Sequence, residues 1–236
     1  MMIKYHPTDE MLMAHAVGEL TASMAIAVSA HCEMCDQCAK KVALFTEKAA
    51  QQAFDAASLN DDNTEASITD SLNEESVDMD AMFGNMLADI MSDETVPKTL
   101  VTPSPQAEIS VCGETYALPR ALRRYHQLGW SSIGTISRAR LPLNEGDTRA
   151  SLLHIGMNGS VPSHTHKGTE LTLLLGGHFE DEHDTYVPGD FIVLDGNNHH
   201  TPQTHDGCLC YTVSDAPLHF TKGVSQLLNA VGRVIY

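Results

Sequence analysis

The sequence predicts an α + β protein of two domains, with helices in the N-terminal part and a β-rich C-terminal part. Residues 1–57 are rich in Ala, Met and Leu and contain a single proline, Pro7, a composition that favours helices. Beyond Pro97, short β-type runs alternate with Gly, Pro, Asn and Asp, which is typical of a β-sandwich or small barrel. The 236 residues suffice for one large or two modest domains.

About four helices are expected in the first domain. Thr8 or Asp9 can cap a helix over residues 9–18, a second helix covers 21–30, and a third runs from about Cys35 through 49. Residues 49–97 then contain 12 acidic and no basic residues. The first half of this stretch, 58–76, is predicted to be a solvated acidic linker.

The second half of the acidic stretch, residues 78–94, is predicted to be a fourth helix with an apolar stripe. Apolar side chains recur there at helical spacing, at Met79, Met82, Phe83, Met86, Leu87 and Ile90. Two interpretations stay open. The helix either packs on its own domain, or it presents a Met-rich face that can re-pack against a partner.

The β-rich part contains five predicted strands and a terminal helix. The strand runs are Glu108–Val111, Ser151–Met157, Glu170–Leu175, Phe191–Leu194 and Cys208–Val213. The tail over residues 224–234 has helical spacing and is expected to cover one edge of the sheet.

The charge balance restricts the partners. The formal net charge of −17 argues against direct binding to nucleic acid or to an anionic membrane, and it favours a partner with a basic surface. The sequence shows no signal peptide and no apolar run near the ~20 residues that span a bilayer, so a cytoplasmic location is expected. In that compartment the six Cys are predicted to be thiols or metal ligands rather than disulfides.

A first group of metal-ligating residues lies near the N-terminus. His31, Cys35 and Cys38 share one face of a helix or helix start, and His6 precedes them. Two imidazoles and two thiolates form the tetrahedral set of a structural zinc site, which would join the N-terminus to the third helix. The alternatives are ordinary thiols with surface histidines, or an iron–sulfur site that includes Cys32 but lacks a fourth cysteine at the required spacing.

A second group lies in the β-rich part. His164 and His166 alternate onto one face of a strand, and Glu170 follows a short turn. The segment from Pro188 supplies another imidazole, from His200 or the adjacent His199. Three imidazoles and a carboxylate bind a first-row divalent ion, either in a closed site or with a water position left open.

Both groups resemble known motifs. The His-x-His-x3-Glu run, Gly177 and the Pro-Gly-Asp to His200 segment resemble the two motifs of the cupin superfamily, whose fold is a double-stranded β-barrel. The N-terminal His and Cys set is similar to the zinc-binding anti-sigma domain. In this order the chain resembles the ChrR family of anti-sigma factors. It departs from the cupin pattern in the position of Gly159 and in having Asp195-x-Asn197 before His200, a register that favours His200 over His199 as ligand.

The resemblance implies a zinc-binding helical domain over 1–94 and a cupin domain with a C-terminal helix over 95–236. It implies zinc in the first domain and a divalent metal in the second, with zinc first and iron, nickel or manganese as alternatives. The implied function is sequestration of an extracytoplasmic-function sigma factor, related to sigma-E, and its release on singlet oxygen or peroxide. The resemblance also implies that the protein is not an enzyme and that two copies can form a homodimer through their cupin domains.

The residues alone leave three questions open. Cys208 and Cys210 share a strand face and are either small core residues or thiols that oxidise near the metal. A metal-dependent cupin dioxygenase acting on a small molecule is the alternative function. A metal or small-ligand sensor without a sigma partner is the third class. Cys112 receives no role.

Overall fold

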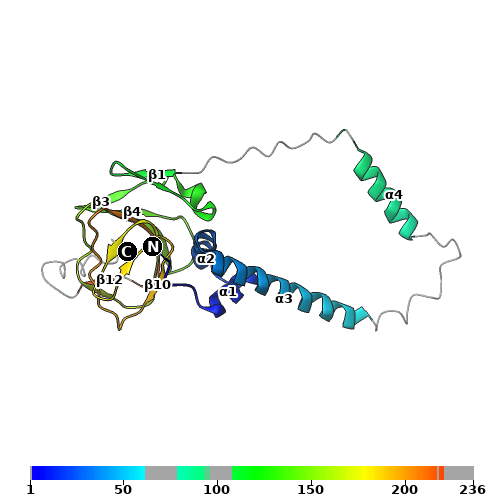
Figure 1. The fold of residues 1–236 in the computed structure, drawn as a ribbon, viewed down its shortest axis with the longest axis horizontal. Coiled ribbons are helices and arrows are strands. Elements are labelled where there is room, and N and C mark those ends of the chain that lie inside the picture. The colour runs from blue at the N-terminus through cyan, green and yellow to red at the C-terminus, as the bar shows by residue number, and fades with distance from the viewer. Residues whose placement is uncertain (1, 62–78, 94, 96–107, 217, 221–236) are drawn as a thin grey trace. The chain divides into compact units, whose positions relative to one another are not determined.

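The computed structural model describes residues 2–61, 79–93, 95, 108–216 and 218–220 (Figure 1). Residues 1–50 with 106–236 form one compact unit, and residues 51–105 form a second one. The helices within the described ranges are α1 (Asp9–Ala16), α2 (Ala22–Met34), α3 (Asp36–Asp61), α4 (Met79–Ser92) and the short 3-10 helix η1 (Arg120–Tyr125). The predicted helical N-terminal part is therefore present, and η1 is an additional helix that the sequence did not predict.

Local signals set the ends of α1 and α2. Thr8 Oγ1 accepts a hydrogen bond from the Met11 N–H at 3.3 Å, so Thr8 caps α1 and not Asp9. Gly18 follows α1 with a φ of +76°, the left-handed conformation that glycine adopts at low cost. α2 continues past the predicted end at residue 30, because no helix-breaking residue occurs before Cys35.

α3 corrects one sequence-based prediction. The helix continues to Asp61, so the linker predicted over 58–76 is wrong for residues 58–61. Residues 50–61 contain Ala, Gln and Leu and no Gly or Pro, and this high helix propensity prevails over the polar character that suggested a linker. Residues 62–76 lie outside the described residues.

The C-terminal part is a β-sheet domain, as predicted. Its strands are β1 (Glu108–Val111), β2 (Glu114–Ala117), β3 (Ser131–Ile133), β4 (Ile136–Arg140), β5 (Arg149–Ile155), β6 (His164–His166), β7 (Glu170–Gly177), β8 (Phe179–Glu180), β9 (Thr185–Tyr186), β10 (Phe191–Leu194), β11 (Cys208–Ser214) and β12 (Leu218–Phe220). The five predicted runs coincide with β1, β5, β7, β10 and β11, with small differences at their ends.

One antiparallel sheet dominates this domain. Its strand order is β10-β7-β11-β5-β4-β3, and the pairs β1-β2, β12-β6 and β8-β9 form separate ladders. Isolated bridges add further pairings, including His164 with His200. The hydrogen bonds among the described strands do not close into a continuous ladder, so the double-stranded barrel implied by the resemblance is observed as a large sheet faced by short ladders.

The two faces of this sheet belong to two hydrophobic clusters. Leu209 and Tyr211 of β11 pack in a cluster that also contains Val28 of α2. Cys208 and Cys210 point to the opposite face and pack in a second cluster within the β-domain. The sheet therefore separates the helices from an inner space, and the second metal-ligand group lies on the inner side.

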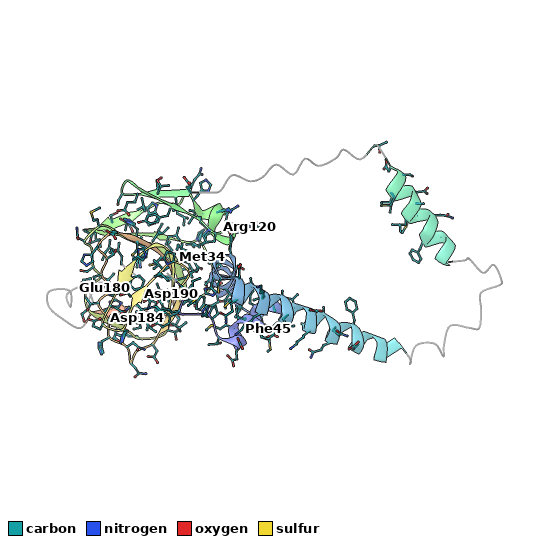
Figure 2. The ribbon with its side chains drawn as sticks, viewed as in Figure 1. Met34, Phe45, Arg120, Glu180, Asp184 and Asp190 are labelled. Atoms are coloured by element: carbon teal, nitrogen blue, oxygen red, sulfur yellow. The ribbon has the colours of Figure 1, made fainter. Side chains whose placement is uncertain are left out.

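Polar contacts fix α2 to the β-domain. Glu145 accepts hydrogen bonds from the Ser23 N–H at 2.9 Å and the Ser23 hydroxyl at 2.5 Å, at the N-terminus of α2. Tyr211 donates its hydroxyl to the Ser23 carbonyl at 3.0 Å. At the other end of the helix, the Arg120 N–H of η1 donates to Glu33 at 2.7 Å, close to Met34 (Figure 2).

Some expectations fall outside the described residues or stay predictions. The C-terminal helix over 224–234 and most of the acidic linker lie outside them. The domain boundary between residues 94 and 95 falls where the chain is only partly described, and it stays a prediction. Within the described ranges, no helix combines the length and the hydropathy that crossing a bilayer requires.

We expect the Glu145→Ala variant to lower the free energy of unfolding by about 1–2 kcal/mol. The reason is that two donors at the N-terminus of α2 lose a charged acceptor. Urea unfolding of the metal-loaded protein measures this change, with Glu108→Ala on exposed β1 as the control, expected within about 0.5 kcal/mol of the parent. Equal losses for the two variants would contradict the anchoring role of Glu145.

Candidate metal centres

The N-terminal group of four residues comes together in space. The ligand atoms of His6, His31, Cys35 and Cys38 all lie within 4.8 Å of one another. His6 Nδ1 is 3.5 Å from each of the two thiol sulfurs. We call this group the helical centre. Cys32 is not part of it, which disfavours the iron–sulfur alternative.

The junction of two helices positions three of these residues. His31 lies in the last turn of α2, Cys38 lies in the first turn of α3, and Cys35 is the residue between the two helices, with an extended φ of −129°. The i, i+4, i+7 spacing is thus met across a helix break and not along one continuous helix. His6 reaches the group from the extended segment before α1.

The contacts of His31 orient it as a ligand. Its Nδ1 lies 2.7 Å from the Gly189 carbonyl, which can only accept, so Nδ1 carries the proton. Its Nε2 is therefore a lone-pair acceptor, and this buried atom has no hydrogen-bond partner among the described residues. A buried imidazole nitrogen that faces two thiols without a partner fits a metal ligand, with the carbonyl fixing the tautomer.

The Cys38 thiol needs a cation to ionise. Burial, followed by the neighbouring Cys35, raises the pKa of Cys38 to about 12. Burial also raises the pKa of Cys32, to about 11. A divalent cation reverses this effect for a thiol that it binds, because it stabilises the thiolate directly. Two thiolates and two imidazoles match the preference of Zn²⁺.

The second group of four residues also converges. The ligand atoms of His164, His166, Glu170 and His200 lie within 4.8 Å of one another. His200 Nε2 is 3.0 Å from His164 Nε2 and 3.2 Å from His166 Nε2. His166 Nε2 is 3.3 Å from the Glu170 carboxylate. We call this group the β-domain centre.

Local structure explains this convergence. β6 turns both of its histidines inward and Thr165 outward, as strand alternation requires. Glu170 begins β7, and His200 is placed by its bridge to His164. His200 is buried, whereas His199 is exposed and does not belong to the group.

The outer nitrogens of two histidines have fixed partners. His164 Nδ1 donates to the Pro162 carbonyl at 2.9 Å, and His200 Nδ1 lies 3.1 Å from the Asp181 carboxylate. Both inner Nε2 atoms are thereby left as lone-pair donors toward a cation. Asp181 was not singled out from the sequence, because it lies in an acidic run and no spacing rule links it to His200.

The electrostatics of the β-domain centre favour neutral ligands. Burial, followed by the neighbouring imidazoles, lowers the pKa of His164 to about 4 and that of His166 to about 3. Burial raises the pKa of Glu170 to about 7. Imidazoles that resist protonation are ready to bind a cation, and a bound cation would favour the ionised carboxylate.

A small cavity adjoins this centre. Its volume is about 50 Å³, and apolar side chains such as Val161, Phe179 and Leu194 line it. The other lining residues include three of the four ligand residues, His164, Glu170 and His200, and also Cys210. The space is far below the roughly 300 Å³ of a pocket that encloses a drug-sized molecule. It suits water or a comparably small species.

Cys208 and Cys210 lie on the inner sheet face, 0% and 2% exposed. The hydrogen bond with Cys208, followed by burial and by the charge of Glu170, raises the pKa of Cys210 well above its usual value. The Cys210 thiol is therefore protonated and weakly nucleophilic as it stands. Their oxidation stays a prediction.

The stripe on α4 is exposed. The helix predicted over 78–94 is present as Met79–Ser92. The side chains of Met82, Phe83, Met86, Leu87 and Ile90 are 49–62% exposed. The side chain of Met79 lies outside the described residues. The partner interpretation and internal packing both stay predictions.

Comparison with known proteins finds similarity to one family and to two of its named members. Residues 119–217 match the family described as the ChrR cupin-like domain. The chain is 29% identical over 236 residues to the anti-sigma-E factor ChrR of Cereibacter sphaeroides, which covers 99% of this chain and 100% of the relative. The crystal structure of Rhodobacter sphaeroides SigE in complex with the anti-sigma ChrR matches with a TM-score of 0.59 and 24% identity, over 91% of this chain and 100% of that one.

We expect the Asp181→Asn variant to weaken divalent-metal binding at the β-domain centre by about 10–100-fold. The amide oxygen still accepts the backbone N–H groups of the turn, but the amide NH2 group then faces His200 Nδ1 and cannot accept its proton. Competition with a chelator of known affinity measures the change. Asp206→Asn, on an exposed turn, is the matched control and should leave the affinity unchanged. Unaltered affinity in Asp181→Asn would remove Asp181 from the site.

Proposed function

We propose that this chain is a member of the ChrR family that binds a sigma factor of the extracytoplasmic-function type and holds it inactive. The similarity to a named anti-sigma-E factor runs over 99% of this chain and 100% of the relative. That relative is named an anti-sigma factor, which is a regulator and not an enzyme. We assign the same non-enzymatic role to this chain.

The exposed stripe on α4 carries the proposal. It offers an apolar, Met-rich face on a segment of the chain that has 12 acidic and no basic residues between positions 49 and 97. A sigma factor presents basic surfaces that bind DNA and polymerase. Apolar contact on α4 would supply affinity, while the acidic surroundings would steer a basic partner toward it.

The helical centre is assigned a structural role in the N-terminal helices. With zinc bound, His6 would join the N-terminal segment to the α2–α3 junction, which contains the other three ligands. Zinc here supplies structural cross-linking and no reaction chemistry. A small helical region with few buried side chains depends on such a cross-link for its fold.

Release is assigned to the β-domain centre and to an oxidative signal, singlet oxygen or a peroxide. We assign zinc as the preferred metal of this centre. Iron, nickel and manganese are alternatives that the donor set also accepts. The buried thiol of Cys210 lines the adjoining cavity, so oxidation of Cys208 and Cys210 and loss of the metal are the two chemical routes available there.

The enzymatic alternative, a metal-dependent cupin dioxygenase, is disfavoured by the cavity. A volume of about 50 Å³ accepts a small oxidant but encloses no organic substrate. A sensor without a sigma partner is disfavoured by the exposed stripe on α4, which that function would not require. A cytoplasmic location, no direct contact with nucleic acid and pairing through the β-domain remain parts of the proposal.

We expect the triple variant Met82→Asp, Phe83→Asp, Met86→Asp to abolish binding of the cognate sigma factor, with at least a 100-fold loss of affinity (about 3 kcal/mol). Three charges replace the apolar contact at the centre of the stripe. The matched control, Asn85→Asp with Ala88→Asp, adds charge to the rest of α4 and should bind within a few-fold of the parent. Co-purification and calorimetry measure both, and undiminished binding by the triple variant would refute the assignment.

A further inference from the structure

The extended segment before α1, residues 3–6, which we call the N-terminal strap, is held by a buried carboxylate of the β-domain. Asp190 is 0% exposed and accepts the Lys4 N–H at 2.7 Å, the Tyr5 N–H at 3.1 Å and the Val187 N–H at 2.8 Å. The Phe191 N–H of edge strand β10 donates to the Tyr5 carbonyl at 3.0 Å. The strap therefore extends the sheet edge, and His6 follows directly from it.

Gly189, the residue before Asp190, contacts both His31 of the helical centre and Ile3 of the N-terminal strap. Its carbonyl accepts from His31 Nδ1 at 2.7 Å. Its φ is +99°, and an added Cβ would lie 2.4 Å from the Ile3 side chain. The Gly189-Asp190 pair thus touches a ligand of the helical centre and the strap that carries another ligand.

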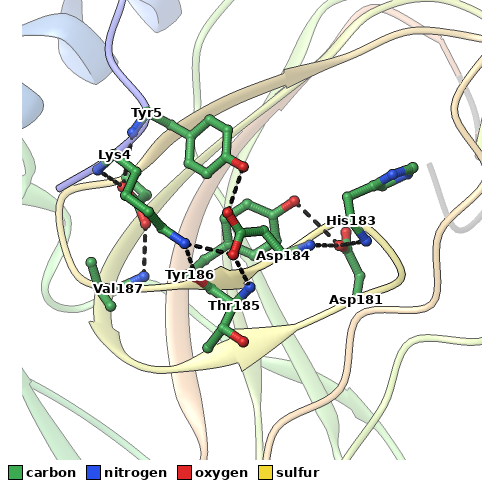
Figure 3. A network of polar contacts seen from close by, with 9 residues as sticks. Lys4, Tyr5, Asp181, His183, Asp184, Thr185, Tyr186 and Val187 are labelled. Atoms are coloured by element: carbon green, nitrogen blue, oxygen red, sulfur yellow. Dashed lines mark hydrogen bonds and ion pairs between the residues drawn. The ribbon is translucent and has the colours of Figure 1, made fainter. Parts of the chain in front are cut away.

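A second carboxylate holds the strap from the turn between β8 and β9 (Figure 3). Asp184 accepts the Lys4 ammonium at 2.6 Å and the Tyr5 hydroxyl at 2.8 Å. The rings of Tyr5 and Tyr186 pack with their centroids 5.3 Å apart. The Lys4 and Asp184 side chains are 44% and 32% exposed, so their ion pair contributes little on its own, and the tyrosine contacts carry this attachment.

The same turn is organised by Asp181, which contacts a ligand of the β-domain centre. Asp181 accepts the His183 N–H at 2.8 Å, the Asp184 N–H at 3.2 Å and the Tyr186 hydroxyl at 3.2 Å on one oxygen (Figure 3). Its other oxygen faces His200 Nδ1 at 3.1 Å. The Asp181 side chain is 1% exposed. One buried carboxylate therefore joins a ligand of the β-domain centre to the turn that holds the strap.

We propose that the turn over residues 181–186 couples the two metal centres. When the β-domain centre holds its ion, His200 is fixed, Asp181 is fixed with it, and Asp184 and Tyr186 hold Tyr5 and the strap in place. Loss of that ion frees His200, relaxes the turn and loosens the attachment of His6 to the helical centre. Because coupling of this kind is reciprocal, loss of the ion from the helical centre also weakens binding at the β-domain centre.

This inference rests on metal binding at both centres, but it does not rest on a sigma partner. Asp190 anchors the strap in both states, because it is fully buried and its hydrogen bonds do not involve the turn side chains. The contact that responds is the one between Tyr5 and Asp184, and it identifies the variants that test the coupling.

The test uses the full chain loaded with Co²⁺, because thiolate-to-cobalt charge-transfer absorption reports the helical centre alone. The rate at which excess chelator removes this cobalt is compared between the parent and His166→Ala, which empties the β-domain centre without touching Asp181. We expect release to be at least about fivefold faster in His166→Ala. When His166→Ala is added to the Tyr5→Phe or the Asp184→Ala variant, the rate of cobalt release should change by less than about twofold, because the connection is already broken.

Asp206→Ala on an exposed turn is the matched control and should preserve the full effect of His166→Ala. Tyr5→Phe removes a single hydroxyl, so it provides the test even if Asp184→Ala fails to fold. Equal release rates in the parent and His166→Ala, an undiminished difference in Tyr5→Phe, or an absence of thiolate-bound cobalt would each overturn the coupling. Sigma binding is measured separately, so its loss with coupling intact would refute the proposed function alone.

Discussion

Two groups of metal-ligating side chains that converge on one another constrain the rest of the structure. At the helical centre, a partnerless imidazole nitrogen faces two buried thiols, and at the β-domain centre three imidazole nitrogens and a carboxylate lie within 4.8 Å of one another. Burying such groups without compensation is costly, and a divalent cation compensates all four donors at once. The positions of α2, α3, β6 and β7 bring the ligand side chains together.

The helices and the β-domain are more closely joined than a two-domain description suggests. A shared hydrophobic cluster covers one face of the sheet, Glu145 caps α2, and Asp190 holds the N-terminal strap against β10. Gly189 and Asp190 of the β-domain thus contact His31 and the segment that leads to His6. α4 belongs to a separate compact unit, which fits a surface offered to a partner.

The sequence predicted most of the ligand geometry because the ligands obey local spacing rules. The alternation of His164 and His166 and the i, i+4, i+7 pattern at the α2–α3 junction are readable without coordinates. The break at Cys35, the length of α3 and the open hydrogen-bond ladder of the β-domain were not. Asp181, Asp184 and Asp190 were missed as connecting residues, because their partners His200, Tyr5 and Lys4 are brought to them only by the tertiary fold.

The most direct test of this account compares the parent with a Cys35→Ala, Cys38→Ala variant, each co-expressed with the cognate sigma factor. Metal analysis of the purified protein and the amount of bound sigma factor are measured together. The account predicts that the variant loses one zinc ion per chain, keeps the metal of its β-domain and no longer retains the sigma factor. Full retention of the sigma factor by a variant without that zinc would contradict it.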